Sequence, residues 1–278
     1  MPTLAWNSYG KSAVRLTRVV RTTPRHELRE FAIDIALAGD FAKVYTDGDN
    51  SPCIPTDTMK NTVYALAAQH PCDSPEAFGQ ILAGHFIDNF AHVSGVSIKL
   101  HQTLWTRIPV EGRPHDHAFT KAAHQRTAEV RRTRDGLELT GGLAGLEVLK
   151  TSRSAFCGFL VDAYTTLKDA SERIFATTID AAWKFTPGAR DYNALADTVR
   201  DILLQVFATH DSKGVQHTLY AMGEAVLAAA PHLEEITLSM PNQHRILANI
   251  ALFNLPNDNE VFITTSEPYG VIQGTIRR

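Results

Sequence analysis

The chain lacks the features that mark several classes of protein. It has only three cysteines among 278 residues, Cys53, Cys72 and Cys157, and their odd number and wide spacing argue against a disulfide framework or a zinc finger. It has no unbroken run of about 18 apolar residues and no apolar segment near its start, which disfavours membrane spanning and export. A formal net charge of -3 provides no field for nucleic acid or an acidic membrane. We therefore expect a globular protein of a reducing compartment, most simply the cytoplasm.

The pattern of apolar residues predicts alternating pairs of strands and helices in the first half. Alternation over residues 11–21 and 28–37 predicts a β-hairpin, and helical patterns follow over residues 57–70 and from Ser74 onward. A period of two resumes at Val96 and predicts further strands as far as Arg131. The first half therefore reads as two strands, two helices and two strands.

The second half repeats this order, which indicates an internal duplication. Strands are predicted over residues 136–151 and 173–185, and two helices and further strands follow. We place the two units at residues 1–135 and 136–278. Each would be an α+β unit in which helices cover one face of an antiparallel sheet, and its open edges would favour pairing with further copies.

One stretch without glycine, residues 55–64, changes from polar, hydroxyl-rich residues to an apolar helical pattern. Asp57 has a short carboxylate that suits an N-cap, and Pro55 favours an extended chain before it. Thr56 then lies at a helix N-terminus, where free backbone N–H groups and the macrodipole attract anions. These residues either cap a helix or help to bind an anionic ligand.

The pair His115 and His117 raises the question of a metal site, because two imidazoles two residues apart on a strand share a face. No cluster of cysteine or carboxylate residues at a metal-binding spacing accompanies them. We expect a structural role for both histidines, and no metal or other cofactor.

Five ordered segments together resemble urate oxidase, the uricase family. They are YGKSAVRLTRVVR (9–21), PTDTMKNTVYALA (55–67), SAFCGFLVDAYTTLKDASERI (154–174), VQHTLYAMGEAVL (215–227), and MPNQH with NDNEVF (within 240–262). The resemblance implies two tandem T-fold units per chain and a tunnel-shaped, barrel-like homotetramer. It also implies oxidation of urate by O2 and water to 5-hydroxyisourate and hydrogen peroxide without a cofactor.

The resemblance also assigns roles to residues inside those segments. It implies that the active site is shared between subunits, with one side supplied by Lys11, Thr56 and Asp57. The other side would bind urate through Phe156 as a stacking ring and Arg173 and Gln216 as hydrogen-bonding forks. The remaining assignments are Val215 and Leu167 lining the pocket, Asn242 with Thr56 holding O2 or water, and His244 completing a proton relay with Lys11 and Thr56.

The chemistry of urate explains why such residue types suit it. Urate is flat and anionic, so an aromatic ring can stack on it, and arginine and glutamine can pair with its edges. It can also act as its own reductant towards O2, which leaves the protein to move protons and stabilise negative charge on oxygen. Cys157, beside Phe156, stands where many relatives have a larger residue and leaves the local packing open.

Simpler interpretations of the same residues remain. Phe156 could belong to the core, Arg173 could lie at a strand edge, and Gln216 could be solvated in the first turn of a helix. At the level of function, a hydrolase or isomerase of a related heterocycle is one alternative, although several such T-fold enzymes rely on a glutamate or on zinc. A non-catalytic purine- or pterin-binding T-fold protein is another, and it would need none of Lys11, Thr56 and His244.

Overall fold

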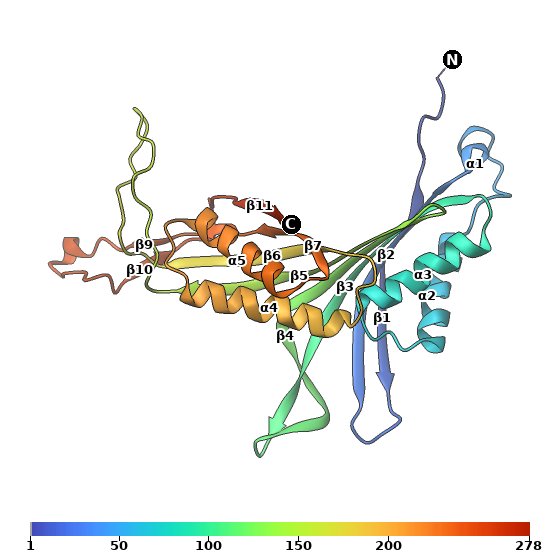
Figure 1. Ribbon diagram of the computed structural model, residues 1–278, viewed down its shortest axis with the longest axis horizontal. Helices are drawn as coiled ribbons and strands as arrows, with labels where there is room; N and C mark the ends of the chain where they lie inside the picture. The colour runs from blue at the N-terminus through green and yellow to red at the C-terminus, as the bar shows by residue number, and fades with distance from the viewer. Residues whose placement is uncertain (1) are drawn as a thin grey trace. The chain divides into compact units, whose positions relative to one another are not determined.

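The computed structural model describes residues 2–278, which form two compact units (Figure 1). One unit comprises the chain up to Gly142 together with Pro187–Asn193, and the other comprises Leu143–Thr186 and Ala194–Arg278. Each unit combines antiparallel strands with helices, so the predicted α+β class is confirmed. The boundary between residues 135 and 136, which was drawn from the repeated order of elements, stays a prediction.

The first unit is built on a four-stranded antiparallel arrangement in the order β1-β2-β3-β4. Its elements are β1 (Tyr9–Val20), β2 (Glu27–Gly39), α1 (Ala42–Thr46), α2 (Thr56–Gln69), α3 (Pro75–Asn89), β3 (Val93–Val110) and β4 (Arg113–Thr133). The predicted hairpin is formed by β1 and β2, in which every second residue of β2 from Phe31 to Leu37 is buried.

Helices α2 and α3 bury the apolar side chains of this sheet. Helix α3 packs on β3 and β4, and α2 packs on β1, so both lie on one face of the strands (Figure 1). The Ser74 side chain accepts a hydrogen bond from the Ala77 N–H at 3.1 Å, with Pro75 at the first helical position, as the sequence predicts. The shared core includes Ile33, Phe78 and Leu100.

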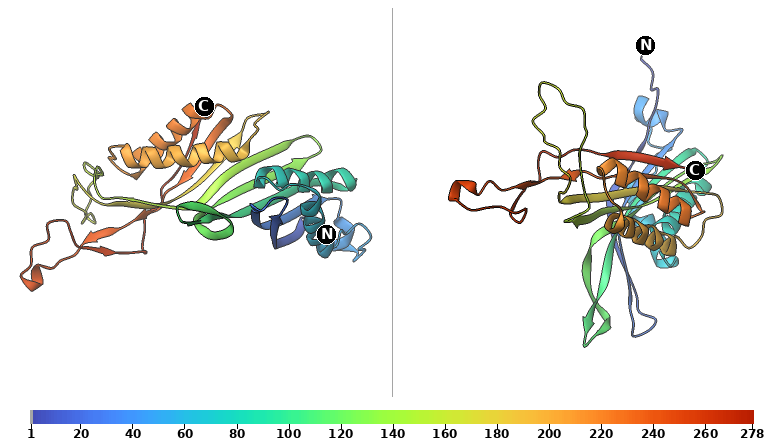
Figure 2. Two further views of the ribbon diagram at one scale, coloured as in Figure 1. Left: turned by 90° about the horizontal axis from the view of Figure 1, so that it is seen from below. Right: turned by 60° about the vertical axis from the view of Figure 1, so that its left-hand side comes forward.

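The second unit repeats this plan and adds a long excursion. Its elements are β5 (Leu137–Lys150), which begins in the first unit, β6 (Phe175–Phe185), α4 (Tyr192–Thr209), α5 (Val215–Ala229), β7 (Leu233–Ser239), β8 (Asn242–Gln243), β9 (Arg245–Leu247), η1 (Ala251–Phe253), β10 (Phe262–Thr264) and β11 (Gln273–Arg277). The strand order is β5-β6-β7-β11, with β8 on β6 and with β9 paired to β10. Helices α4 and α5 lie side by side over the strands (Figures 1 and 2).

The excursion in this unit and two of its short strands, β8 and β9, were not predicted. The last sheet strand, β11, pairs with β7 only after an excursion over residues 240–272, which carries β8, β9, η1 and β10 (Figure 2). Strands β8 and β9 escape prediction because two or three residues cannot show a period, whereas β10 lies among the further strands that the alternation predicts. No helix within residues 2–278 is both long and apolar enough to cross a bilayer.

Candidate active site

Lys11 lies on β1 beside an irregularity in the pairing of this strand with β2. It pairs with Ile35 on β2, and the register shifts between Lys11 and Val14, where Ala13 has a φ of 55°. The Ala13 N–H donates to the Asp34 carboxylate at 2.7 Å, which holds this bulge in place. Bulges re-aim neighbouring side chains. A β-carbon at Gly10 would lie 1.8 Å from the Ile35 carbonyl oxygen, so only glycine allows this approach of the strands.

Thr56 is the first residue of α2, so the predicted location at a helix N-terminus is confirmed. The predicted N-cap is wrong, however, because Pro55 rather than Asp57 occupies the cap position and no side chain caps this helix. Asp57 lies one position inside the helix, where its carboxylate accepts hydrogen bonds from Lys60 and from Asn61 at 2.9 Å. Because Lys60 and Asn61 bind the Asp57 carboxylate, it does not cap the backbone N–H groups of the first turn.

The absence of a side-chain cap has a consequence for the first turn of α2. Its leading N–H groups have no partner within the helix, and the half-buried Thr56 hydroxyl lies beside them. The pKa of Asp57 lies below its ordinary value, chiefly because Lys60 donates to the carboxylate, with a smaller effect from the positive charge of Lys11. Lys11 is thus close enough to Asp57 to act on it electrostatically.

Phe156 and Arg173 are held together in the second unit by a short network of main-chain hydrogen bonds. The Arg173 N–H donates to the Ser154 carbonyl at 2.8 Å, and Phe156 exchanges two hydrogen bonds with Ala170 at 2.7 and 3.0 Å. Ser154 also forms a bridge with Ser212, just before α5. The ends of the segment from Ser154 to Arg173 therefore meet, although they are far apart in sequence.

The side chains of this network converge as well. The guanidinium carbon of Arg173 lies 5.2 Å from the centre of the Phe156 ring. A β-carbon placed on Gly214 would lie 3.6 Å from both the Gln216 side-chain oxygen and the Phe156 ring. The structure thus brings together Phe156, Arg173 and Gln216, with Val215 buried at the start of α5 beside Gln216.

Electrostatically, Arg173 is prepared for an anion. Burial lowers the pKa of its guanidinium, and the opposing effect comes from the Cys157 thiol rather than from a carboxylate. Its Nε is buried and has no hydrogen-bond partner within residues 2–278. The N-terminus of α5 adds backbone donors and the positive end of a helix dipole. A half-buried cation with an unused donor favours an anionic ligand with acceptors along one edge.

Asn242 and His244 follow β7 in the excursion. Asn242 pairs with Thr177 on β6, and its N–H donates to the Gly270 carbonyl at 2.8 Å. The His244 ring is exposed, while its carbonyl accepts from the Thr265 N–H at 3.2 Å. Asn242 is therefore fixed to the same strand that follows Arg173, and His244 extends beyond the sheet.

Leu167 is a predicted site residue that the structure leaves largely exposed rather than buried against Phe156, Arg173 or Gln216. It lies in the loop between Phe156 and Ala170, and 60% of its surface is exposed. The other predicted residues form two groups. Lys11, Thr56 and Asp57 belong to the first unit, whereas the residues from Phe156 onward belong to the second.

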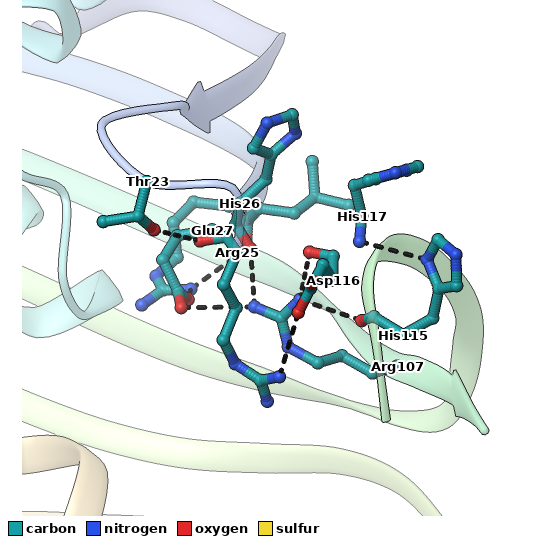
Figure 3. A network of polar contacts seen from close by, with 10 residues as sticks. Thr23, Arg25, His26, Glu27, Arg107, His115, Asp116 and His117 are labelled. Atoms are coloured by element: carbon teal, nitrogen blue, oxygen red, sulfur yellow. Dashed lines mark hydrogen bonds and ion pairs between the residues drawn. The ribbon is translucent and has the colours of Figure 1, made fainter. Parts of the chain in front are cut away.

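His115 and His117 lie at the tip of the β3–β4 hairpin, in a network that Figure 3 shows. The His117 N–H donates to His115 Nδ1 at 3.2 Å, and Arg107 donates to the carbonyls of His115 and Asp116. Arg107 also reaches the carbonyl of His26 in the β1–β2 turn, at 2.5 Å. The segment thus ties two hairpins together. Within residues 2–278, no group of three or more His, Cys, Asp or Glu side chains is arranged to hold a metal ion.

A comparison with protein families decides the relationship. The model of the family described as Uricase matches residues 7–131 and 139–273, one match in each half of the chain. The chain belongs to the uricase family. Membership in this family makes the protein an enzyme of the urate oxidase type.

Relatives and solved structures of the uricase family agree along the full length. The uricase of Arthrobacter globiformis is 40% identical over 276 residues, which cover 99% of this chain and 90% of the relative. The uricase of Aspergillus flavus is 35% identical, covering 97% and 95%. The crystal structure of the Arthrobacter globiformis uricase has a TM-score of 0.95 at 39% identity and covers 100% of this chain and 96% of its own. That of the Bacillus sp. TB-90 urate oxidase has a TM-score of 0.87 at 26% identity, covering 98% and 100%.

Two aromatic residues of this uricase-family site were not predicted. Phe159 stacks on Phe156 with ring centres 5.0 Å apart and planes 12° apart. A stacked substrate must therefore use the other face of Phe156 or displace Phe159. The Tyr9 hydroxyl bonds both the N–H and the carbonyl of Ile54, which precedes α2. Phe159 lies three residues after Phe156, and Tyr9 lies two residues before Lys11. Closeness in sequence to a predicted site residue was therefore the one signal that could have indicated them.

A cavity of about 390 Å³ lies in the second unit, beside β8. It is lined by Glu147, Pro241, Gln243, Arg245, Thr264, Thr265, Ser266 and Tyr269. Its β8 residue, Gln243, alternates with Asn242, and adjacent strand residues point to opposite faces. The predicted residue Asn242 is therefore on the face away from this cavity.

Proposed function

We propose that this uricase-family enzyme oxidises urate with O2 and water to 5-hydroxyisourate and hydrogen peroxide, without a metal or flavin. Two electrons leave urate and reduce O2 to peroxide, while water supplies the new hydroxyl group. The observation that supports this most strongly is Arg173, a half-buried guanidinium beside an aromatic ring and an amide, whose Nε has no hydrogen-bond partner within residues 2–278. An anionic, flat, hydrogen-bonding ring satisfies all three groups.

In this proposal the second unit binds the substrate. Arg173 provides two parallel donors for one edge of urate, and Gln216 pairs with another edge. Phe156 stacks on the ring, Val215 offers a backbone contact at the first turn of α5, and Leu167 closes the pocket from its loop. Because Leu167 is exposed in a single chain, its part in the site depends on a neighbouring subunit or on movement of the loop.

The first unit begins the proton path, and His244 of the second unit completes it. Lys11, with Thr56 as a relay, removes a proton from the bound substrate, and His244 completes the path to the oxygen site. Thr56 and Asn242 hold O2, and later water, against the ring face. Asp57 contributes to substrate binding from the start of α2, where its carboxylate also accepts from Lys60. The backbone N–H groups in the first turn of α2 have no partner within the helix, so they can stabilise negative charge near Thr56.

The assembly in this proposal is a homotetramer with a central tunnel, in the cytoplasm, built from units at residues 1–135 and 136–278. Each active site combines Lys11, Thr56 and Asp57 of one chain with the second-unit residues of a neighbouring chain. The division of the predicted residues between two units supports this arrangement, because head-to-tail pairing of two-unit chains brings unlike units together twice. The three free cysteines, one of them exposed, fit a reducing compartment.

The test is the loss of urate absorbance in aerobic buffer by protein that has been exhaustively stripped of metal, with peroxide quantified in parallel. We expect one peroxide per urate consumed, no flavin spectrum, and the same rate after chelation. Activity that returns only when a metal is added would contradict the cofactor-free proposal. Tight urate binding without turnover would instead identify a non-catalytic purine-binding protein.

A further inference from the structure

Thr177 and Thr178 are adjacent on β6 and face opposite sides of the second sheet. Thr177 is 0% exposed and shares its face of β6 with Phe175 and Ile179, which belong to the core beneath α4 and α5. Thr178 is half-buried, and its hydroxyl accepts a hydrogen bond from the Gln243 side chain at 2.8 Å. Alternation along the strand therefore separates the two hydroxyls.

The pairing of β6 with β8 assigns Asn242 to the face of Thr177. Asn242 lies directly opposite Thr177, and Gln243 lies opposite Ala176. Residues that oppose each other in an antiparallel pair place their side chains on the same face. The hydrogen bond from Gln243 to Thr178 is the one expected from this register, because Thr178 and Ala176 share a face. Asn242 and Thr177 are the corresponding pair on the helix-covered face.

The hydrogen-bonding capacity of the Thr177 hydroxyl is unused in the part of the chain that the structure describes. Its oxygen is buried and has no hydrogen-bond partner within residues 2–278. A buried hydroxyl without a partner destabilises the folded state, because it loses its hydrogen bonds to water and gains none in return. A valine of nearly the same shape would avoid this cost. The residue at the next position, Thr178, does use its hydroxyl, so the difference between them requires an explanation.

We propose that Thr177 is a positioning residue for Asn242. In the substrate-loaded site the Thr177 hydroxyl donates to the side-chain oxygen of Asn242, so that the Asn242 amide N–H groups face the oxygen site. An asparagine amide has an acceptor at one end and donors at the other, and either end can face the ring unless a neighbour fixes it. Negative charge that develops on oxygen during reduction needs donors.

This inference rests on the proposed function, because it takes Asn242 as the residue that holds O2. It adds a residue that touches neither urate nor O2 and that acts only through Asn242. It also accounts for the position of Thr177, which lies four residues after Arg173 on the same chain segment and opposite Asn242.

The experiment compares Thr177→Val with Thr177→Ser, and uses Thr178→Val as the matched control. Thr177→Val removes only the hydroxyl, Thr177→Ser keeps it, and Thr178→Val removes the hydroxyl on the other face. We expect Thr177→Val to lower kcat/KM for O2 roughly threefold to tenfold, the range of one hydrogen bond. Anaerobic binding of urate should not change. Thr177→Ser should keep most of the activity, and Thr178→Val should keep the O2 dependence of the unchanged protein.

A folding defect would not produce this result. Because Thr177→Val replaces an unpartnered buried hydroxyl by a methyl group, we expect its melting temperature to stay equal or to rise. Lower O2 reactivity in an equally stable protein with unchanged urate affinity supports the positioning role. A lower melting temperature with weaker urate binding would show a merely structural residue and overturn it.

Asn242→Ala separates failure of this inference from failure of the proposed function. If Asn242→Ala reduces O2 reactivity while Thr177→Val behaves like Thr178→Val, the positioning role is wrong and the proposed function stands. If Asn242→Ala leaves O2 reactivity unchanged, the role of Asn242 in the proposed function is wrong and the positioning role falls with it. In the double variant, Thr177→Val should add nothing to the effect of Asn242→Ala.

Discussion

Tyr9 holds Ile54 through both of its main-chain polar groups. The Tyr9 hydroxyl donates to the Ile54 carbonyl at 3.2 Å and accepts from the Ile54 N–H at 2.8 Å. Burial raises the pKa of Tyr9, so the phenol stays protonated and keeps its donor. Lys11 lies two residues after Tyr9, and Thr56 lies two residues after Ile54. The Tyr9–Ile54 contact therefore joins the two chain segments that carry these predicted catalytic residues.

Tyr9→Phe should therefore affect both stability and turnover. It leaves a half-buried N–H and carbonyl without a partner, at a cost of about 1–3 kcal/mol in the free energy of unfolding. We also expect kcat to fall more than urate affinity, because Lys11 and Thr56 lose their mutual alignment. Urea unfolding and steady-state kinetics measure the two effects. Tyr45→Phe, which loses a single exposed hydrogen bond to the Ser8 carbonyl, is the control and should change neither by much.

Arg173→Lys and Lys11→Met should affect different kinetic constants. A lysine ammonium cannot present two parallel donors to one edge of a ring, so Arg173→Lys should raise KM for urate strongly, on the order of tenfold or more. Lys11→Met removes a proton acceptor but leaves the forks and the stacking ring, so it should mainly lower kcat. The measurement is urate consumption over a range of urate concentrations. An effect of Lys11→Met on urate affinity alone would show that Lys11 is not part of the relay.

Arg126 and Glu76 provide a prediction about stability in the first unit. Glu76 is 0% exposed and Arg126 is 8% exposed, and one guanidinium nitrogen lies 2.8 Å from each carboxylate oxygen. Arg126→Met leaves a buried carboxylate without its partner and should cost about 3–5 kcal/mol in unfolding free energy. The double change Glu76→Met with Arg126→Met should cost less than the single one. Chemical denaturation of the three proteins tests this, and equal losses from the single and the double change would contradict it.

The stability of the second unit should fall as the pH drops below about 6.5, the usual pKa of histidine. Burial, followed by the neighbouring His217 and Lys150, lowers the pKa of His210 in the folded protein. The unfolded chain therefore binds a proton at a pH at which the folded chain does not, and protons favour unfolding in that window. Above the unfolded pKa this contribution to stability is fully present.

Urea unfolding midpoints between pH 8 and pH 5, roughly the range in which histidine titrates, measure this effect. His210→Asn should make the midpoint fall less steeply with decreasing pH than in the unchanged protein. A residual slope is expected, because burial also lowers the pKa of His85. Identical slopes for the two proteins would show that His210 does not contribute.

Mixing two inactive chains tests whether the active site is shared. Lys11→Ala carries its lesion in the first unit and Arg173→Ala in the second. In a mixed pair one shared site collects both lesions and the other collects neither, so random pairing should restore roughly a quarter of the activity. Sites built within single chains would recover none. A dead mixture, in which mass spectrometry proves that mixed assemblies are present, would mean that both groups of residues serve one chain.

Features that depend on neighbours in sequence were predictable for physical reasons. The alternation from Phe31 to Leu37 predicts β2, because burial on one face of a strand repeats every second residue. Ser74 and Pro75 predict the start of α3, because a cap acts within one helical turn. The family and the α+β class follow from segments of 5 to 21 residues whose order survives in the sequence.

Features that depend on contacts between distant segments needed the tertiary structure. Asp57 carries the chemistry of an N-cap, but Lys60 and Asn61 compete for its carboxylate, and Pro55 takes the cap position. Pairing of β8 with β6 brings Asn242 opposite Thr177 across 64 intervening residues, and no local pattern specifies that register. The sequence by itself determined the family, the elements and the residue types of the site. Only the tertiary structure decided which hydroxyl faces Asn242 and which faces Gln243, because a side chain's face follows from strand pairing, and pairing is a long-range choice.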